Sequence, residues 1–494
     1  MTLKMNAKMF LKKSLMMTFL SFILAGCAAI DHEAPLDFSN LDIPTFSEVT
    51  VHDPSVIRVG DTFYVFGSHL AVAKSQDLMH WTQIAFNAHG THPIFGNAQE
   101  KFADTLAWAE TDTFWAPDMI QLADGRFYFY YNACRGDSPL SAMGIAVADA
   151  IEGPFEDLGI ILKSGMWDQI SPDGQIYDAN IHPNVVDPHV FFDSENRLWM
   201  MYGSYSGGIF ILELDPETGF PFEGQGYGLR MLGGNHLRIE APYVIHSPST
   251  GYYYMFLTFG GLDAVGGYNM RIMRSARPYG PYYDASGQAM SEVRGPVGSF
   301  FDDITAARYG SVIMRNHHFL HVEGESGSRF TTGYVSPGHN SVYRDSVTGR
   351  YFLIFHTRFT QRGEYHRLRV HEMFLNEDGW FVVAPHRYSG QDRLNYGEID
   401  IIGTYKFIRH DREISAEVRD SVLIELNIDG TITGEIEGNW SYQRDSHFID
   451  LVIDDVTYRG VVSHQWNEDA QAFVMTFTAM SLEGISIWGS MVAK

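Results

Sequence analysis

Five short runs of aromatic and β-branched residues, each placed behind a turn, form the most regular pattern along the chain. Phe63-Tyr64-Val65-Phe66 follows the turn Gly60-Asp61, and Phe127-Tyr128-Phe129-Tyr130 follows Asp124-Gly125. Runs of this kind, hinged on Gly, Asp or Asn, predict β-hairpins. Apolar residues seldom recur at the i, i+3, i+4, i+7 spacing of an amphipathic helix without a Gly or Pro among them. The pattern therefore predicts an all-β fold.

Each run is preceded by the same kind of opening, a small or acidic residue followed by Pro, or once by His. The five openings are Asp53-Pro54, Ala116-Pro117, Asp187-Pro188, Ala241-Pro242 and Gly338-His339. They lie 54 to 97 residues apart, which accommodates one four-stranded unit and a variable loop in each repeat. Residues 49–387 are therefore expected to form a five-bladed β-propeller. A β-sandwich or a solenoid would give no reason for the repeats to carry different polar residues at one equivalent position.

The pattern changes near Tyr388, where shorter alternating strands begin. Residues 388–494 are expected to form a separate all-β domain of ordinary size, a small barrel or a sandwich. Trp440, Trp466 and Trp488 occur about once per strand region, which favours core positions over sugar binding. The function of this domain stays open.

The N-terminus has the pattern of an export signal and is set apart from the fold. A basic start is followed by an apolar run from Leu15 to Ala25, too short to cross a bilayer as a mature helix. The run ends in Leu24-Ala25-Gly26-Cys27, which resembles the bacterial lipobox. Residues 1–26 are therefore expected to be a lipoprotein signal peptide, with Cys27 lipidated and residues 27–48 a polar tether. The alternative is an ordinary secretory signal with an incidental Cys.

These features predict an exported, monomeric protein that a lipid holds at the bacterial cell surface or envelope. If Cys27 carries lipid, Cys134 has no partner for an intrachain disulfide, because the chain contains 2 Cys. The balance of 35 basic and 60 acidic residues gives a net charge of −25, which argues against a nucleic-acid partner. A neutral extracellular polymer is compatible with such a surface.

Three of the five openings place a carboxylate at or beside the equivalent position: Asp53, Asp187 and Glu240. The inner strands of all blades surround one central channel, so these acids are expected to converge there. Glycosidic hydrolysis needs a carboxyl that donates a proton and a second that serves as base or nucleophile, and a third acid can raise the pKa of the donor. Metal binding by the three acids is the competing chemistry, although no tight His-x-His or Asp-x-Asp cluster supports it. Asp118 follows Pro117 instead of preceding a Pro, which indicates a structural role.

The segments around the three acids, taken together and in this order, look like the catalytic segments of glycoside hydrolase family 43. They read His52-Asp53-Pro54-Ser55-Val56, Val186-Asp187-Pro188 and Arg238-Ile239-Glu240-Ala241-Pro242-Tyr243. Four further segments are similar to the endo-1,5-α-L-arabinanases of that family: Phe66-Gly67-Ser68-His69-Leu70, Phe114-Trp115-Ala116-Pro117-Asp118, Ser336-Pro337-Gly338-His339-Asn340-Ser341 and Phe355-His356-Thr357-Arg358-Phe359. The C-terminal region resembles, more loosely, the extra domain of two-domain arabinanases.

The resemblance implies an inverting hydrolase with Asp53 as general base and Glu240 as general acid. Asp187 would raise the pKa of the acid and orient it. His339 matches the arabinanase histidine beside a central Ca²⁺ ion that is otherwise held mainly by water. The alternative for His339 is a histidine that packs the channel without a metal.

Four further residues are candidates for substrate binding. His52 precedes the base, Trp115 lies just ahead of a channel position where its ring could stack on a sugar, and Asn184 and Ser204 lie near Asp187 in the sequence. A blade-interface role for Trp115, and ordinary strand-end roles for Asn184 and Ser204, are equally compatible with the sequence.

The sequence thus predicts endo-acting hydrolysis of α-1,5-L-arabinofuranosidic bonds in arabinan. An exo-acting arabinofuranosidase or β-xylosidase of the same family is the first alternative, because blade loops decide whether the channel is blocked at one end. A non-catalytic propeller that captures glycans is the second, and a retaining fructan hydrolase the third. A non-catalytic propeller would not require all three acids together.

Overall fold

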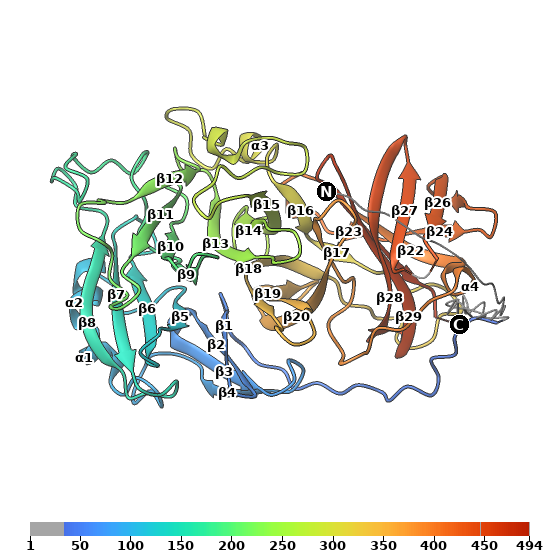
Figure 1. The fold of residues 1–494 in the computed structure, drawn as a ribbon, viewed down its shortest axis with the longest axis horizontal. Coiled ribbons are helices and arrows are strands. Elements are labelled where there is room, and N and C mark those ends of the chain that lie inside the picture. Colours follow the sequence, from blue (N-terminus) through green and yellow to red (C-terminus); the bar gives the residue numbers. More distant parts are fainter. Residues whose placement is uncertain (1–33, 445, 494) are drawn as a thin grey trace, which may run out of the picture. The chain divides into compact units, whose positions relative to one another are not determined.

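The computed structural model describes residues 34–444 and 446–493. The predicted signal peptide and the predicted lipidation of Cys27 lie outside the described residues. Within these ranges, no helix is long and apolar enough to cross a membrane. The segment 34–48 runs along both domains (Figure 1), and Leu36 and Phe38 pack against the core of the C-terminal barrel. Apolar side chains therefore attach this part of the predicted tether to the folded protein.

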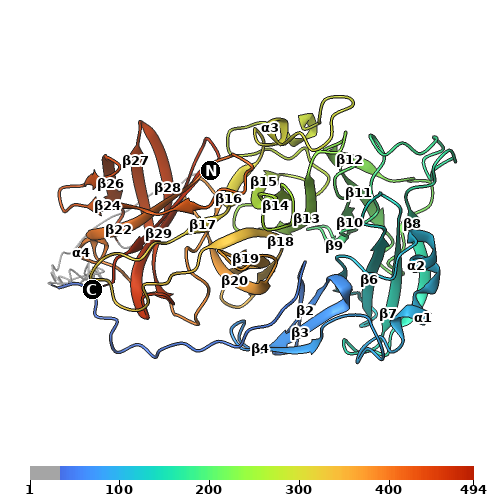
Figure 2. The same ribbon diagram turned by 180° about the vertical axis from the view of Figure 1, so that it is seen from behind.

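Five sheets, each built on four consecutive antiparallel strands, follow one another along the chain and confirm the predicted propeller (Figures 1 and 2). The first sheet holds β1 (Ser55–Val59), β2 (Thr62–Gly67), β3 (Ala71–Ser75) and β4 (Trp81–Ala85), and the second holds β5 (Asp118–Gln121), β6 (Phe127–Cys134), β7 (Ser141–Ala148) and β8 (Glu156–Lys163). The third sheet holds β9 (His189–Phe192), β10 (Leu198–Tyr202), β11 (Ile209–Leu214) and β12 (Leu229–Leu232), and the fourth holds β13 (Ile239–His246), β14 (Tyr253–Phe259), β15 (Asn269–Ser275) and β16 (Ser311–Met314). The fifth sheet holds β18 (Tyr334–Arg344), β19 (Tyr351–Phe359), β20 (His366–Leu375) and β21 (Phe381–Val383). Three of the predicted openings directly precede the first strand of their sheet, and the other two lie within it.

The five sheets close into a ring. The first strand of each sheet contacts the first strands of both neighbours, in the circular order β1, β5, β9, β13, β18 and back to β1. Apolar clusters fill the spaces between adjacent sheets, and one of them joins the first blade to the last through Val51, Val65, Ile354 and Val370. Because the first strands line the centre, they bring Asp53, Asp187, Glu240 and His339 together there.

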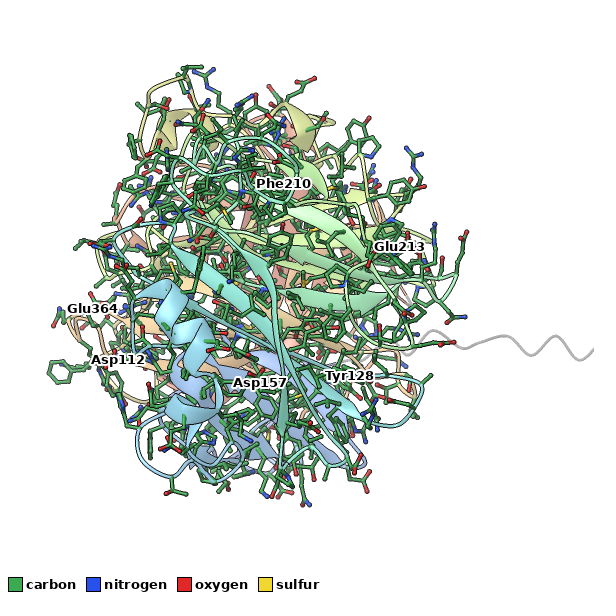
Figure 3. The ribbon with its side chains drawn as sticks, turned by 90° about the vertical axis from the view of Figure 1, so that its left-hand side faces the viewer. Asp112, Tyr128, Asp157, Phe210, Glu213 and Glu364 are labelled. Carbon is green, nitrogen blue, oxygen red and sulfur yellow. The ribbon has the colours of Figure 1, made fainter. Side chains whose placement is uncertain are left out.

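Other elements cover the blades. Helices α1 (Ala98–Lys101) and α2 (Ala103–Ala109) lie against the second sheet (Figure 3), where Phe102 packs on Phe114 and Tyr131. Two 3₁₀ turns, at Ser68–Leu70 and Met290–Glu292, and helix α3 (Asp303–Ala306) lie in the loops of the first and fourth blades.

Asp118 has the structural role that its position predicts. Its buried carboxylate accepts hydrogen bonds from the hydroxyl of Ser55 and from the backbone N–H of Val190, at 2.6 Å for the latter. These contacts join the inner strands of three neighbouring blades, and we expect their loss to destabilise the ring.

The C-terminal domain is a closed eight-stranded antiparallel barrel. Its strands are β22 (Gly403–His410), β24 (Val422–Leu426), β25 (Thr431–Gly434), β26 (Gly438–Tyr442), β27 (Phe448–Ile453), β28 (Val456–Asn467), β29 (Ala472–Ser481) and β30 (Ser486–Met491), and helix α4 (Glu398–Ile401) precedes them. The pairing of β22 with both β24 and β30 closes the barrel. Trp440 and Trp488 are buried in apolar core clusters, which confirms their predicted place, whereas Trp466 is buried but lines a cavity.

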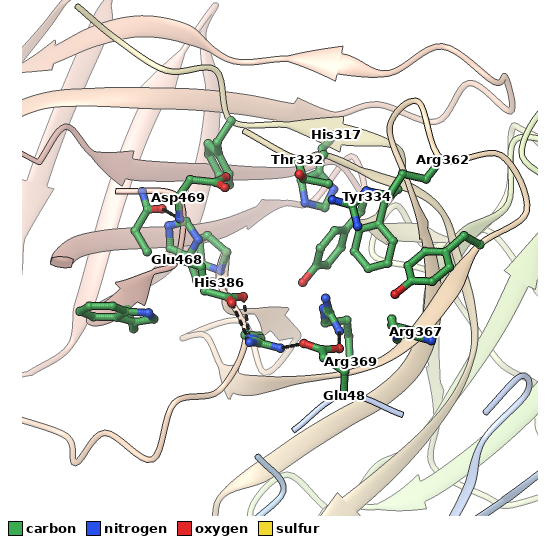
Figure 4. Close-up of a pocket in the computed structure, with 18 residues that line it drawn as sticks. Glu48, His317, Thr332, Tyr334, Arg362, Arg367, Arg369, His386, Glu468 and Asp469 are labelled. Carbon is green, nitrogen blue, oxygen red and sulfur yellow. Dashed lines mark hydrogen bonds and ion pairs between the residues drawn. The ribbon is translucent and has the colours of Figure 1, made fainter. Parts of the chain in front are cut away.

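The barrel contacts the fifth blade, whose sheet is extended by β17 (His317–His318) and β23 (Arg419–Asp420). A cavity of about 280 Å³ lies along this contact (Figure 4). Beside it, Arg387 pairs with Glu48 at 2.6 Å and with Glu468 at 2.6 Å, and Glu48 also pairs with Arg369. This network connects the segment before the first blade, the fifth blade and the barrel.

Candidate active site

Four channel positions share an uncommon backbone conformation. Asp53 (φ 54°), Asp187 (φ 55°), Ala241 (φ 57°) and His339 (φ 48°) all lie in the left-handed region. L-residues pay a steric cost there, and such strain is concentrated at functional sites. The repeated turn therefore positions Asp53, Asp187 and His339. In the fourth blade it is formed by Ala241, which directly follows Glu240.

Asp53 lies among histidines. Its Oδ2 is 2.7 Å from Nδ1 of His52, and its Oδ1 is 3.0 Å from Nδ1 of His339. Ser68 donates a hydrogen bond to Oδ2, and the backbone N–H of Asp53 donates to Nδ1 of His356 at 3.2 Å. Burial alone would raise the pKa of Asp53, but the charges of His339 and His52 outweigh it and hold the pKa well below its usual range. Asp53 is therefore ionised over a wide pH range.

Glu240 has a different environment on the fourth blade. Ser204 donates a hydrogen bond to Oε2 at 2.6 Å, and the hydroxyl of Tyr268 donates to Oε1 at 2.5 Å. Burial raises the pKa of Glu240, and these two hydrogen bonds oppose the rise because they favour the ionised carboxylate. The net rise leaves Glu240 protonated to higher pH than an ordinary Glu.

Asp187 interacts electrostatically with both other acids and with His339. Its Oδ2 accepts a hydrogen bond from the backbone N–H of Ala241 at 3.3 Å, which places it beside the Glu240–Ala241 peptide. Burial raises the pKa of Asp187 well above its usual value; His339 opposes the rise, and the charges of Glu240 and Asp53 add to it. For His339, burial would lower the pKa, but the negative charges of Asp53 and Asp187 raise it to about 9.

The potential metal ligands near His339 do not form a calcium site built from protein atoms alone. Within residues 34–444 and 446–493, one group of three closely spaced potential ligands occurs, His52, Asp53 and His356, and two of its donors are imidazoles. Calcium takes six to eight oxygen ligands. Nδ1 of His339 faces Asp53, so a metal ion at this residue would be bound through Nε2. The described residues would thus supply one imidazole ligand from His339 and no cage of protein oxygens.

The four predicted substrate-binding residues have different surroundings. His52 contacts Asp53 and stacks on His356 at 3.8 Å between ring centroids. Trp115 is half-buried. The hydroxyl of Ser204 bonds to Glu240, which makes it a partner of the predicted acid. The buried side chain of Asn184 contacts Ser141 and the thiol of Cys134, and we find no contact between it and the three acids among the described residues.

Sequence reasoning missed three residues that contact the predicted base or acid. Ser68 and His356 belong to segments that carry the family resemblance, and they became identifiable as partners of Asp53 only from the fold. Tyr268 precedes β15, outside all the repeated openings, and no local pattern marks it.

The three carboxyl groups of the channel differ in their tendency to ionise. The pKa of Asp53 is lowered, whereas the pKa values of Glu240 and Asp187 are raised, so one ionised carboxyl lies near two that favour the protonated form. Glycoside hydrolysis needs such a separation between a base and an acid.

Comparison with known proteins supports this chemistry. The family model described as glycosyl hydrolases family 43 matches residues 44–302, and a model described as a C-terminal lipocalin-like domain matches residues 385–489. The chain is similar to extracellular endo-alpha-(1->5)-L-arabinanase 2 of Bacillus subtilis, with 54% identity over 90% of this chain and 94% of the relative. It is also similar to an extracellular endo-alpha-(1->5)-L-arabinanase of Thermotoga petrophila, with 50% identity over 91% of this chain and 95% of the relative.

Two solved structures resemble most of the chain, including both domains. The crystal structure of a family 43 glycoside hydrolase from Bacillus licheniformis has a TM-score of 0.88 and 55% identity, and covers 91% of this chain and 100% of its own. That of an endo-1,5-alpha-L-arabinanase from Thermotoga petrophila has a TM-score of 0.86 and 50% identity, with the same coverage of 91% and 100%. An exo-alpha-(1->5)-L-arabinofuranosidase of Cellvibrio japonicus is more distant, at 26% identity over 67% of this chain and 86% of the relative.

Proposed function

The chain belongs to glycosyl hydrolases family 43, and from this premise we infer that it hydrolyses internal α-1,5-L-arabinofuranosidic bonds of arabinan. The observation that carries the inference is the similarity of 50–54% over nine tenths of the chain to endo-acting arabinanases. The exo-acting relative is only 26% identical. Endo action is therefore favoured over exo action.

We propose that Asp53 and Glu240 share the chemistry. Glu240, whose raised pKa keeps its proton, protonates the leaving glycosidic oxygen. Asp53, whose lowered pKa keeps it ionised, takes a proton from a water molecule that attacks the anomeric carbon from the opposite face, which inverts the configuration. When Asp187 is ionised, its negative charge disfavours a second charge on Glu240 and so favours the protonated acid.

Product analysis tests the function. The protein is incubated with debranched arabinan, branched arabinan, xylan and levan, and product length and anomeric configuration are followed by NMR. Early long arabino-oligosaccharides with inverted configuration are expected. Arabinose as the sole early product would contradict endo action, and retained configuration would contradict the role of Asp53 as base.

The hydrogen bonds to Glu240 predict a shift of the pH profile. The profile of kcat/KM should fall at low pH as Asp53 is protonated, and at high pH as Glu240 loses its proton. Ser204→Ala or Tyr268→Phe removes a hydrogen bond that favours ionised Glu240, so the pKa of Glu240 should rise and the alkaline limb should move to higher pH. Tyr205→Phe is the matched control, because the Tyr205 hydroxyl bonds to the carbonyl of Gly260. A limb that stays in place in both variants would contradict Glu240 as the titrating acid.

We also propose that His339 holds a Ca²⁺ ion whose other ligands are mainly water. When bound, the ion would add positive charge near the three carboxylates. Treatment with a strong chelator should then lower thermal stability and activity, and added Ca²⁺ should restore both. Unchanged stability and rate after metal removal verified by elemental analysis would leave His339 as an imidazolium that pairs with Asp53.

The extracellular relatives support export of this chain. We propose in addition that Cys27 carries the lipid anchor and that the protein works as a monomer. The intact mass of the protein from the membrane fraction tests the anchor, and light scattering of the released protein tests the monomer. An unmodified Cys27 would leave an ordinary secretory signal.

A further inference from the structure

Two adjacent aromatic side chains lie exposed on the fourth blade, in the loop that precedes α3. Phe300 and Phe301 have exposed fractions of 68% and 51%. Large apolar groups gathered at the surface mark binding sites more often than isolated ones do. The two rings belong together, because their centroids are 6.2 Å apart at an interplanar angle of 85°.

The loop is attached to the segment that carries Glu240. Arg238, two residues before Glu240, forms a bidentate ion pair with Asp303 and lies over the ring of Phe301 at 5.8 Å. The backbone N–H of Phe301 donates a hydrogen bond to the carbonyl of His236 at 3.2 Å. The position of the two rings is therefore coupled to the position of the predicted acid.

The backbone around the rings is strained. Phe301 has φ 55°, His236 has φ 57°, Asn235 has φ 52° and Tyr205 has φ 48°. A bulky residue such as Phe in the left-handed region is an outlier that Gly or Asn would relieve. Folding stability would favour another residue at position 301, so a role for the exposed ring offers a reason for the strain.

Both phenylalanine rings pack against other aromatic side chains. Phe300 stacks on His236 with centroids 4.2 Å apart and an interplanar angle of 11°. Phe301 contacts Tyr205 edge-on at 5.6 Å. Tyr205 directly follows Ser204, which donates a hydrogen bond to Glu240. The aromatic group of Tyr205, His236, Phe300 and Phe301 therefore includes a sequence neighbour of a hydrogen-bond partner of the predicted acid.

The aromatic group lies on the acid side of the channel. Tyr205 follows β10 of the third blade, and Phe300 and Phe301 belong to the fourth blade, which also carries Glu240, whereas Asp53 and the histidines around it come from the first and fifth blades. The general acid lies beside the leaving oxygen, and the attacking water approaches from the opposite side. A sugar attached to the leaving oxygen therefore extends towards the third and fourth blades.

We propose that His236, Phe300 and Phe301 form an aromatic platform that stacks on a furanose ring on the leaving-group side of the scissile bond. This inference rests on the proposed function. The platform binds a neutral pentofuranose through the apolar face of its ring, and it selects substrates that continue beyond the cleaved bond. It thereby favours cuts within a chain over removal of single terminal residues.

Two substrates distinguish the platform from a general effect. Linear arabinohexaose places sugars on the leaving-group side, whereas an α-arabinotriosyl fluoride has a leaving group too small to reach the platform. Phe300→Ala with Phe301→Ala should lower kcat/KM on arabinohexaose by about tenfold, through a higher KM, and should leave hydrolysis of the fluoride within about twofold. Phe86→Ala is the matched control, because Phe86 is equally exposed, at 68%, and follows β4 on the first blade.

Phe301→Gly separates binding from folding. Gly accepts the left-handed backbone, so the melting temperature should stay unchanged or rise while kcat/KM on arabinohexaose falls. An equal loss on both substrates, or no loss on arabinohexaose, would overturn the platform. A wild-type protein that cleaves neither substrate would instead contradict the proposed function, so the two failures are distinguishable.

Discussion

Replacement of Glu240 by Ala should lower kcat on arabinan by about 10²–10⁴-fold, the usual contribution of a general acid. The loss should be much smaller on an aryl α-L-arabinofuranoside with an acidic phenol, because that leaving group departs without protonation. Steady-state kinetics on a series of aryl substrates measures the effect as a steeper dependence of rate on the pKa of the leaving phenol. The alkaline limb of the pH profile should disappear with the residue that causes it.

Two further variants control this result. Glu240→Gln retains the size of the side chain and should show the same dependence on leaving group. Glu372→Gln changes another buried Glu, which pairs with Arg350 and Arg393 on the fifth blade, and should lower thermal stability without changing that dependence. An equal loss on good and poor leaving groups in the Glu240 variants would contradict Glu240 as the acid.

Replacement of Asp53 by Asn should have the opposite signature. The rate should fall by about 10²–10⁴-fold on arabinan and on aryl substrates alike, since activation of water is needed whatever group leaves. The variant also removes a negative charge that keeps the pKa of His339 at about 9, so the imidazole should titrate at lower pH, which NMR of the ring protons detects. This second readout shows whether the local charge has changed as intended.

Asp118→Asn is the matched control for Asp53→Asn. Asp118 is also a buried Asp beside a Pro in one of the repeated openings, but it bonds to Ser55 and Val190. Its replacement should lower the melting temperature and leave the leaving-group dependence unchanged. Full activity of Asp53→Asn on any of these substrates would remove Asp53 from the mechanism.

The propeller and three of its acids could be predicted from the sequence because their signals are local. A turn followed by alternating apolar residues specifies a hairpin within about twenty residues, and five such units imply a closed ring. Asp53 and Asp187 directly precede a Pro in this repeat and Glu240 precedes one by two positions, so equivalence of position predicted their convergence. The burial of the three barrel tryptophans followed from the same local pattern.

The form of the C-terminal domain was decided by a pairing of distant strands. Barrel and sandwich share the same alternating pattern, and closure depends on hydrogen bonds between β22 and β30, which are separated by most of the domain. The packing of Leu36 and Phe38 likewise depends on the surface of this barrel. The polar segment that contains the two residues gives no sign of that contact.

The electrostatic state of the site is also a property of the tertiary structure alone. A carboxyl pKa depends on burial and on charges within a few ångströms, and the groups that set it come from different blades. His339 and His52 lower the pKa of Asp53 from the fifth and first blades, and Tyr268 and Ser204 bond to Glu240 from elements without a shared motif. The reacting residues were thus readable along the chain, and the family resemblance also implied which of them is the base and which the acid. The charges and hydrogen bonds that separate their pKa values exist only in the tertiary structure, because these interactions act through space.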